Sequence, residues 1–123
     1  MRMKIAITST GKESDAQMDP RFGRCQYFII LDPDTMKFTA HDNAGTMQRG
    51  GAGPMAAKAI SDLGAEILIT GDVGPNAFDA LKAAGIKAYI GASGTVSQAV
   101  QQWKDGKLSE AGTASVASHA GMR

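Results

Sequence analysis

Residues 66–75 of this chain, EILITGDVGP, decide its fold class. The run ILI is apolar at every position, which is typical of a parallel strand that is buried on both faces of its sheet. The turn GDVG follows at once and leads to Pro75, and proline is favoured at the first position of a helix. A buried strand that passes through a glycine-rich turn into a helix predicts an α/β protein.

The same pattern extends in both directions along the chain. Helical and strand-like segments alternate after Pro54, whereas two extended segments joined by Pro33-Asp34 precede it and predict an antiparallel hairpin. The predicted strands are 4–9, 27–32, 37–41, 66–70 and 86–90, and the predicted helices are 54–63, 75–84 and 95–104. We therefore expect an α/β fold of three layers, α/β/α, in which helices cover both faces of a mixed five-stranded sheet.

One domain accounts for most of the chain. A length of 123 residues fits a single domain, which we expect to occupy residues 1–110. Residues 111–123 are small and polar, so we expect them to form a flexible tail. In the first predicted helix, the spacing of Met55, Ala59 and Ile60 places them on the buried side.

The charges of the chain nearly cancel. Its net charge is +1, and we expect no nucleic-acid partner, because such a partner would need a clustered basic face. The apolar stretch near the N-terminus is too short for a signal peptide or a membrane span. Cys25 is the only cysteine and cannot form an internal disulfide, which favours a reducing compartment. We therefore expect a cytoplasmic protein with no membrane partner, monomeric or weakly dimeric.

Three glycine-rich turns precede the three predicted helices. They are Gly50–Gly53 (GGAG), Gly71–Gly74 (GDVG) and Gly91–Gly94 (GASG), and the last two directly follow strands. The carboxyl ends of parallel strands form the edge at which open α/β sheets bind ligands. Exposed N–H groups at helix N-termini attract anions. Together the turns predict an anion site at one edge, although each turn alone is also explained by tight chain reversal.

A second candidate feature is the segment 19–25, DPRFGRC, just before the second predicted strand. Arg21 and Arg24 flank a Phe-Gly pair, and arginine recognises anions through its planar fork. In a purely structural alternative, Asp19 pairs with one arginine and Phe22 fills the core. The sequence leaves both interpretations open.

Candidate metal ligands are few and scattered. Cys25, His41 and His119 have suitable chemistry, and Met18 and Met47 carry soft sulfur. None shows the spacing of a zinc site such as C-x-x-C. Each of the first three also has a structural explanation, namely a small core residue, an exposed strand end and a residue in the tail.

The motifs of several enzyme classes are missing from the sequence. It has no G-x-S-x-G elbow, no H-E-x-x-H motif, no P-loop and no complete dinucleotide fingerprint. The predicted central strands carry almost none of the carboxylates that a metal-dependent nuclease needs. The sequence therefore favours a binding or carrier protein over a hydrolase.

Taken in order, these motifs resemble the dinitrogenase iron–molybdenum cofactor-binding family. They are D-P-R-F-G-R at 19–24, Asn43, G-A-G at 51–53, T-G-x-x-G-P-x-A at 70–77 and G-T-V at 94–96. The resemblance covers residues 4–105. The family includes NifX-like proteins, the C-terminal part of NifB and stand-alone members of the orange-protein type. We expect a stand-alone member, because the chain has no extra domain.

The resemblance implies a ribonuclease-H-like fold without nuclease activity. It also implies non-catalytic binding of an anionic metal–sulfur cluster, either an iron–molybdenum cofactor or its precursor, or a molybdenum–copper sulfide. The implied cofactor-binding residues are Arg21, Phe22, Gly23, Arg24, Asn43, Gly51, Ala52, Gly53, Gly71, Gly74, Gly94 and Thr95. The candidate direct metal ligands are Cys25, His41 and His119. We therefore expect a carrier and not an enzyme.

Two other functions stay open from the sequence. The same turns suit a phosphate group, so the chain could be an enzyme or sensor for a phosphorylated metabolite. A third hypothesis is a protein-interaction module whose partner is a cluster-assembly ATPase.

Overall fold

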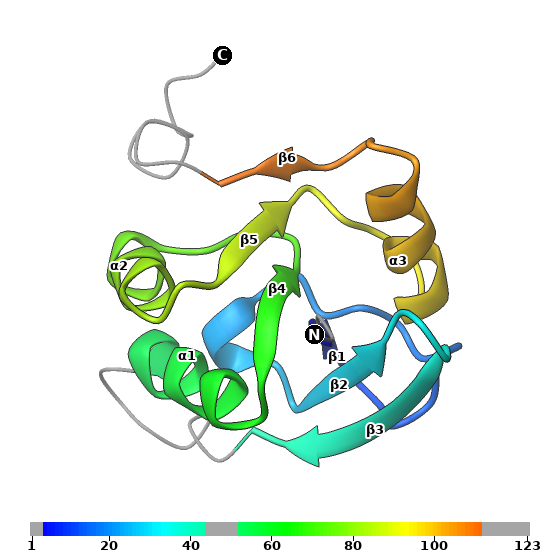
Figure 1. Ribbon diagram of the computed structural model, residues 1–123, viewed down its shortest axis with the longest axis horizontal. Helices are drawn as coiled ribbons and strands as arrows, with labels where there is room; N and C mark the ends of the chain where they lie inside the picture. The colour runs from blue at the N-terminus through cyan, green and yellow to red at the C-terminus, as the bar shows by residue number, and fades with distance from the viewer. Residues whose placement is uncertain (1–3, 44–51, 112–123) are drawn as a thin grey trace.

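Six strands form one mixed sheet in the computed structural model, which describes residues 4–43 and 52–111 (Figure 1). The strands are β1 (Lys4–Ser9), β2 (Tyr27–Asp32), β3 (Lys37–Asp42), β4 (Ala65–Ile69), β5 (Lys87–Ile90) and β6 (Ser109–Glu110). Their order across the sheet is β3-β2-β1-β4-β5-β6. β4 is parallel to both β1 and β5, whereas β2 is antiparallel to β1 and β3, and β6 is antiparallel to β5.

Three helices cover the two faces of the sheet, which confirms the predicted fold class. They are α1 (Ala52–Asp62), α2 (Pro75–Ala83) and α3 (Val96–Lys104). α1 and α2 lie side by side on one face, and α3 lies on the other (Figure 1). A short 3-10 helix, η1 (Phe22–Arg24), contacts α1 just before β2 begins. None of the described helices has the length and apolar character that crossing a membrane requires.

Side chains alternate between the two faces of the central strands and so build two cores. In β4, Leu68 packs on the side of α1 and α2, while Ile67 and Ile69 pack on the side of α3. In β1, Ala6 and Ile7 divide between the two cores in the same way. All five side chains are buried, so the ILI segment is covered on both faces, as predicted.

The sequence predicts five strands, and the structure adds β6 as the sixth. β6 contains only Ser109 and Glu110, which is too short for strand alternation to show in a sequence. The N–H of Ala111 donates a hydrogen bond to the carbonyl of Ala88 at 2.7 Å, and Ala111 is buried. The expectation of a flexible tail is therefore wrong at Ala111, and the rest of that tail, 112–123, lies outside the described residues.

The buried side of α1 also differs from the prediction. Met55 is 43% exposed, whereas Ala56, Ala57 and Ile60 are buried. The small alanine side chains let α1 approach both α2 and the sheet, and this packing turns the longer Met55 side chain outward.

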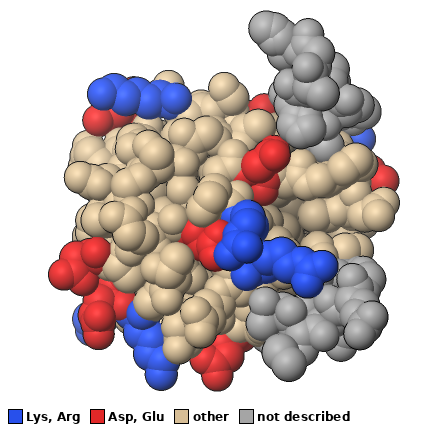
Figure 2. All heavy atoms as spheres, turned by 180° about the vertical axis from the view of Figure 1, so that it is seen from behind, with Lys and Arg blue, Asp and Glu red and all other residues tan. Residues whose placement is uncertain are grey.

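Acidic and basic side chains are mixed over the surface. Figure 2, which shows the molecule from behind, has groups of both signs next to one another near its centre. On α1, Lys58 and Asp62 form an ion pair of 3.0 Å one helical turn apart. This mixing agrees with the net charge of +1.

Candidate functional site

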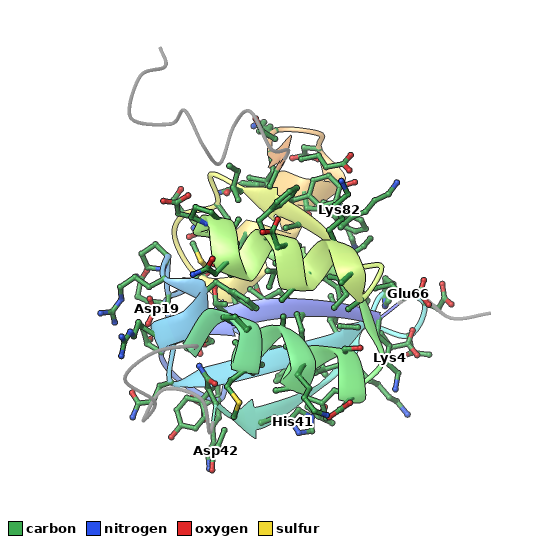
Figure 3. The ribbon with its side chains drawn as sticks, turned by 90° about the vertical axis from the view of Figure 1, so that its left-hand side faces the viewer. Lys4, Asp19, His41, Asp42, Glu66 and Lys82 are labelled. Carbon is green, nitrogen blue, oxygen red and sulfur yellow. The ribbon has the colours of Figure 1, made fainter. Side chains whose placement is uncertain are left out.

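The carboxyl ends of β1, β4 and β5 meet at one edge of the sheet. Figure 3 places Asp19, in the loop after β1, at this end of the molecule, and Lys4 and Glu66 at the opposite end. η1 lies at the same edge as Asp19 because it precedes β2, which runs antiparallel to β1. The fold therefore brings the arginine motif to the edge where the glycine-rich turns lie.

A pocket of about 400 Å³ opens at this edge between η1 and the N-terminal ends of α1 and α2. We call it the η1 pocket. It is lined by Pro20, Arg21, Phe22, Gly23, Arg24, Gly53, Pro54, Asp72, Val73, Gly74, Pro75, Asn76 and Ala77. The arginine motif, the turn at 72–74 and Gly53, which lies in the first turn of α1, therefore meet in one place.

The third glycine-rich turn lies elsewhere. Gly94 and Thr95 do not line the η1 pocket; they contact the loop after β1, where the N–H of Met18 donates to the carbonyl of Gly94 at 2.8 Å. The Thr95 hydroxyl accepts a hydrogen bond from the N–H of Gln98 at 3.1 Å, and Gln98 Oε1 accepts one from the N–H of Thr95 at 2.9 Å. This reciprocal pair is a capping box, so the turn serves to begin α3.

Two glycines allow the walls of the η1 pocket to come close together. A Cβ on Gly71 would lie 2.5 Å from Cβ and 2.7 Å from Cα of Pro20. A Cβ on Gly53 would lie 2.7 Å from Cβ of Ala77, where α1 meets α2. Gly74 is different, because its Cβ would have no neighbour within 4 Å. Gly71 and Gly53 are therefore needed for packing, and Gly74 borders open space.

Arg21 is held by the buried carboxylate of Asp19. Oδ1 of Asp19 accepts hydrogen bonds from the backbone N–H of Arg21 at 2.9 Å and from its Nε at 3.2 Å, and Oδ2 accepts one from Nη2 at 3.3 Å. The Arg21 side chain is 68% exposed, against 5% for Asp19. The hydrogen bond and charge of Asp19 raise the pKa of Arg21. The guanidinium is therefore oriented by Asp19 and still accessible from solvent.

The buried hydroxyl groups of Thr8 and Thr70 form a network that holds the backbone of Asp19. The N–H of Asp19 donates to the carbonyl of Thr8 at 3.0 Å. The Thr8 hydroxyl lies within hydrogen-bond distance of the carbonyl of Asp19 and 2.8 Å from the hydroxyl of Thr70. Thr8 lies in β1 and Thr70 follows β4, so the network ties together the two loops that lead to the η1 pocket.

Phe22 and Asn43 support the η1 pocket from within the core. Phe22 is 2% exposed and packs against Phe28 with ring centroids 6.0 Å apart, which confirms that it fills the core. Asn43 is buried, and its Nδ2 donates to the carbonyls of Cys25 at 2.9 Å and Gly23 at 3.4 Å. Asn43 therefore holds the backbone of the η1 segment and does not line the pocket.

Cys25 lies in the core and not in the lining of the η1 pocket. Its side chain is fully buried, and Sγ donates to the carbonyl of Phe22 at 3.3 Å. Burial, together with the charge of Asp19, raises the pKa of the thiol from 9.0 to about 12. Because the thiolate is the form that binds metals, this environment disfavours Cys25 as a ligand.

The raised pKa of Cys25 predicts a loss of stability in alkaline solution. Above pH 9 the thiol ionises in the unfolded chain but not in the folded one, so its contribution is complete below pH 9 and is lost as the pH rises towards 12. Between pH 8 and pH 10 the free energy of unfolding should fall by about 1 kcal/mol more in the wild type than in Cys25→Ala. Urea unfolding of both proteins at the two pH values measures this difference, and equal losses would contradict it.

The other candidate metal ligands do not gather at the η1 pocket. His41 lies on β3, where its Nε2 is 2.8 Å from Oγ1 of Thr39, and it lines a separate surface pocket. His119 and Gly51 lie outside the described residues, as does the side chain of Ala52. In the part of the chain that the structure describes, no group of three or more His, Cys, Asp and Glu side chains is placed to hold a metal ion.

The structure adds polar groups that the sequence did not assign to the site. Asp72 lines the pocket, and its Oδ1 accepts a hydrogen bond from the N–H of Val73 at 2.9 Å. Gly74 precedes α2 and supplies no side-chain cap, and Pro75, Asn76 and Ala77 of the first turn of α2 line the pocket. These residues belong to the segment 71–77, GDVGPNA. The sequence pattern assigned only its two glycines, Gly71 and Gly74, to the site.

Known proteins share both this fold and this sequence pattern. The apo form of the orange protein from Desulfovibrio gigas is 43% identical and aligns over 90% of this chain and 94% of its own, with a TM-score of 0.86. A candidate NifB protein from Thermotoga is 37% identical and aligns over 88% and 92% of the two chains, with a TM-score of 0.78. An uncharacterized protein from Methanocaldococcus jannaschii is 26% identical over 109 residues, which are 86% of this chain and 89% of that protein.

The sequence model of the dinitrogenase iron–molybdenum cofactor family matches residues 1–106. This match spans both loops of the η1 pocket and all three helices. The chain therefore belongs to the dinitrogenase iron–molybdenum cofactor family.

Proposed function

We propose that this protein binds and carries an anionic metal–sulfur cluster in the η1 pocket without catalysing a reaction on it. The observation that carries the proposal is the meeting of Arg21 and Arg24 with the uncapped first turn of α2 in one open pocket. Both kinds of group donate hydrogen bonds to anions. Membership of the iron–molybdenum cofactor family supports a cofactor-related binding role.

The donor groups suit a soft cluster that is held by charge and hydrogen bonds. Guanidinium and amide N–H groups can donate to the sulfides of such a cluster, and Gly74, which borders open space, leaves the backbone of its turn accessible. The buried thiol of Cys25 does not line the pocket. We therefore place the cluster against Arg21, Arg24 and the α2 amides, with no protein thiolate as its ligand.

The composition of the lining supports binding without catalysis. The described lining residues include no Ser, Cys, His or Lys, and Asp72 is their one carboxylate. Nucleophilic and general acid–base catalysis need an activated nucleophile or a base placed beside a second group. A pocket with two arginines and one carboxylate is better suited to holding an anion than to cleaving a bond.

Gly74 offers a direct test of this proposal. The protein is reconstituted without oxygen, either with tetrathiomolybdate and copper(I) or with iron, sulfide and molybdate. We expect a visible charge-transfer band that co-elutes with the protein. A Cβ at Gly74 meets nothing within 4 Å, so Gly74→Phe should fold and fill the pocket, while Gly74→Ala leaves room. We expect the band in the wild type and in Gly74→Ala, and its loss in Gly74→Phe.

Two results of the reconstitution would overturn the proposal. One is the absence of a protein-bound band under all reconstitution conditions. The other is a band of equal strength in Gly74→Phe, which would place the cluster elsewhere. A rise in melting temperature with sugar phosphates or nucleotides, and none with metal–sulfur anions, would assign the η1 pocket to a phosphorylated metabolite instead.

A further inference from the structure

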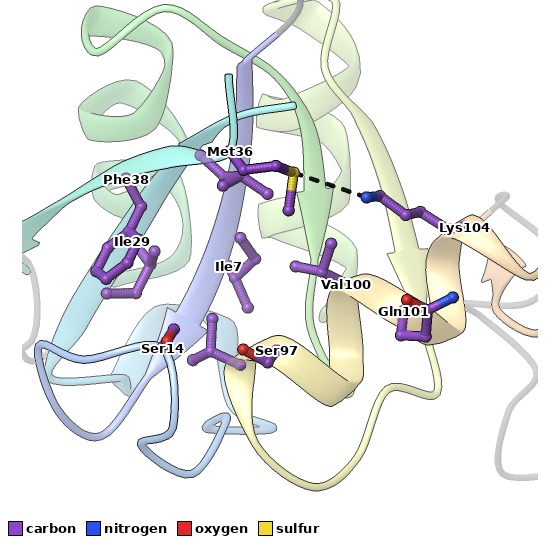
Figure 4. A pocket seen from close by; sticks show the side chains of 11 residues that line it. Ile7, Ser14, Ile29, Met36, Phe38, Ser97, Val100, Gln101 and Lys104 are labelled. Carbon is purple, nitrogen blue, oxygen red and sulfur yellow. Dashed lines mark hydrogen bonds between the residues drawn. The ribbon is translucent and has the colours of Figure 1, made fainter. Parts of the chain in front are cut away.

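A second concave site lies on the opposite face of the sheet, between α3 and the β2–β3 hairpin (Figure 4). We call it the α3 groove. It has a volume of about 270 Å³, and its floor is formed by the side chains of Ile7, Ile29, Leu31, Val96 and Val100. These apolar residues belong to the buried core on the side of α3, so the groove lies directly over that core and its exposed surface comes from the residues of its walls.

Met36 forms one wall of the α3 groove and has an unfavourable backbone conformation. It has φ of 61°, in the left-handed region that disfavours residues other than glycine, asparagine and aspartate. Its side chain is 50% exposed, and the neighbouring wall residue Phe38 is 41% exposed. A strained backbone and an exposed apolar side chain both oppose stability, so folding alone does not explain a methionine here.

Lys104 supplies a positive charge at the same end of the α3 groove. Figure 4 shows it reaching across the mouth to Met36, where Nζ lies 3.6 Å from Sδ. A thioether is a weak acceptor for an ammonium group. Within residues 4–43 and 52–111 Lys104 forms no ion pair, and no other charged side chain lines the groove.

We propose that the α3 groove binds a small amphiphilic carboxylate. The apolar body of this ligand lies against Met36 and Phe38, the exposed apolar side chains of the groove, and its carboxylate pairs with Lys104. The volume is slightly below the range of about 300–1,000 Å³ that is usual for small-molecule pockets, which limits the ligand to a short chain or a single ring. The groove shares no lining residue with the η1 pocket, so this inference does not depend on the proposed cluster.

The proposal is tested with straight-chain carboxylates from butyrate to octanoate and with 1-hexanol as the uncharged probe. Binding to the wild type is followed by methyl chemical shifts of Ile7, Ile29 and Val100. Affinity should rise about fourfold for each added methylene until the groove is filled. The shifts should be confined to the α3 groove and should saturate.

Three variants separate the parts of the proposal. Lys104→Gln should weaken hexanoate binding about threefold and leave 1-hexanol unchanged, while the control Lys107→Gln should alter neither. Ser97 is an exposed lining residue, and Ser97→Phe should block both probes. Met36→Gly should weaken both probes without lowering the melting temperature, because glycine relieves the left-handed strain.

Several outcomes would overturn the proposal. Chemical shifts that do not saturate would contradict binding at a specific site. Equal effects of Lys104→Gln and Lys107→Gln would contradict Lys104 as the partner of the carboxylate. A lower melting temperature for Met36→Gly would show that Met36 serves stability. If the protein is a dimer in sedimentation experiments and Ser97→Phe makes it monomeric, the groove is covered by a second copy of the chain.

Discussion

Replacing Arg21 and Arg24 together by glutamine is expected to weaken binding of the metal–sulfur cluster about thirtyfold. Each guanidinium is exposed enough for its charge-assisted contact to contribute about 1 kcal/mol, and about 1.4 kcal/mol corresponds to a factor of ten in affinity. The fold should survive, because Asp19 keeps the hydrogen bond from the backbone N–H of residue 21. Titration of the variant with the tetrathiomolybdate–copper cluster, followed by the charge-transfer band, measures the loss.

The control for this experiment removes the same charge elsewhere. Lys82 and Lys87 line a separate pocket near β6, and Lys82→Gln with Lys87→Gln lowers the net charge by the same amount. We expect this control to bind the cluster within about twofold of the wild type, because exposed charges at a distance are screened. An equal loss in both double variants would show that only net charge matters, and no loss in either would contradict the η1 pocket as the site.

Gly71→Ala is expected to destabilise the protein by about 2–3 kcal/mol. The added Cβ would lie 2.5 Å from Cβ and 2.7 Å from Cα of Pro20, so relief requires movement of the backbone and not only of a side chain. The same segment carries the hydrogen bond from the N–H of Asp72 to the carbonyl of Pro20 at 3.0 Å. Cluster binding should be reduced in parallel, because both loops border the η1 pocket.

Gly74→Ala is the matched control for Gly71→Ala. It makes the same chemical change three residues further along, where the Cβ has open space and φ is −79°. Its free energy of unfolding should stay within about 0.5 kcal/mol of the wild type. Urea unfolding curves, recorded by circular dichroism, distinguish the two variants. Similar unfolding curves for both variants would show that the backbone at Pro20 moves at little energetic cost to accommodate the added Cβ.

The sequence predicted the layered fold because its strongest patterns are local. The ILI run of β4 is typical of a buried parallel strand, the glycine–proline turn after it is typical of the start of a helix, and both appear where expected. β6 was missed because two residues carry no alternation. The prediction that Met55 is buried was wrong because helical spacing alone does not show which side of the helix faces the core. In α1 that side carries the small residues Ala56 and Ala57.

The composition of the candidate site depends on strand order, which the sequence does not reveal. β3 to β4 and β4 to β5 are successive parallel connections that cross the sheet in one direction. Right-handed crossovers therefore place α1 and α2 on the same face, and their N-terminal ends meet in the η1 pocket. α3 leads to the antiparallel strand β6, to which that rule does not apply, so the turn at Gly94 was predicted at the correct edge but lies apart from the other two.

The Asp19–Arg21 ion pair has a consequence for the release of a bound anion from the η1 pocket. A carrier must give up its cargo, and a site made only of unpaired cations would hold an anion too firmly to do so. Here the guanidinium has a resident counter-ion only 3.2 Å away, fixed in the core by Thr8. For the proposed carrier we therefore expect Arg21 to stay paired with Asp19 when no anion is bound, so the free protein has a compensated guanidinium at this position. We also expect the carboxylate to lower the affinity for the anion, because it already compensates part of the charge of Arg21.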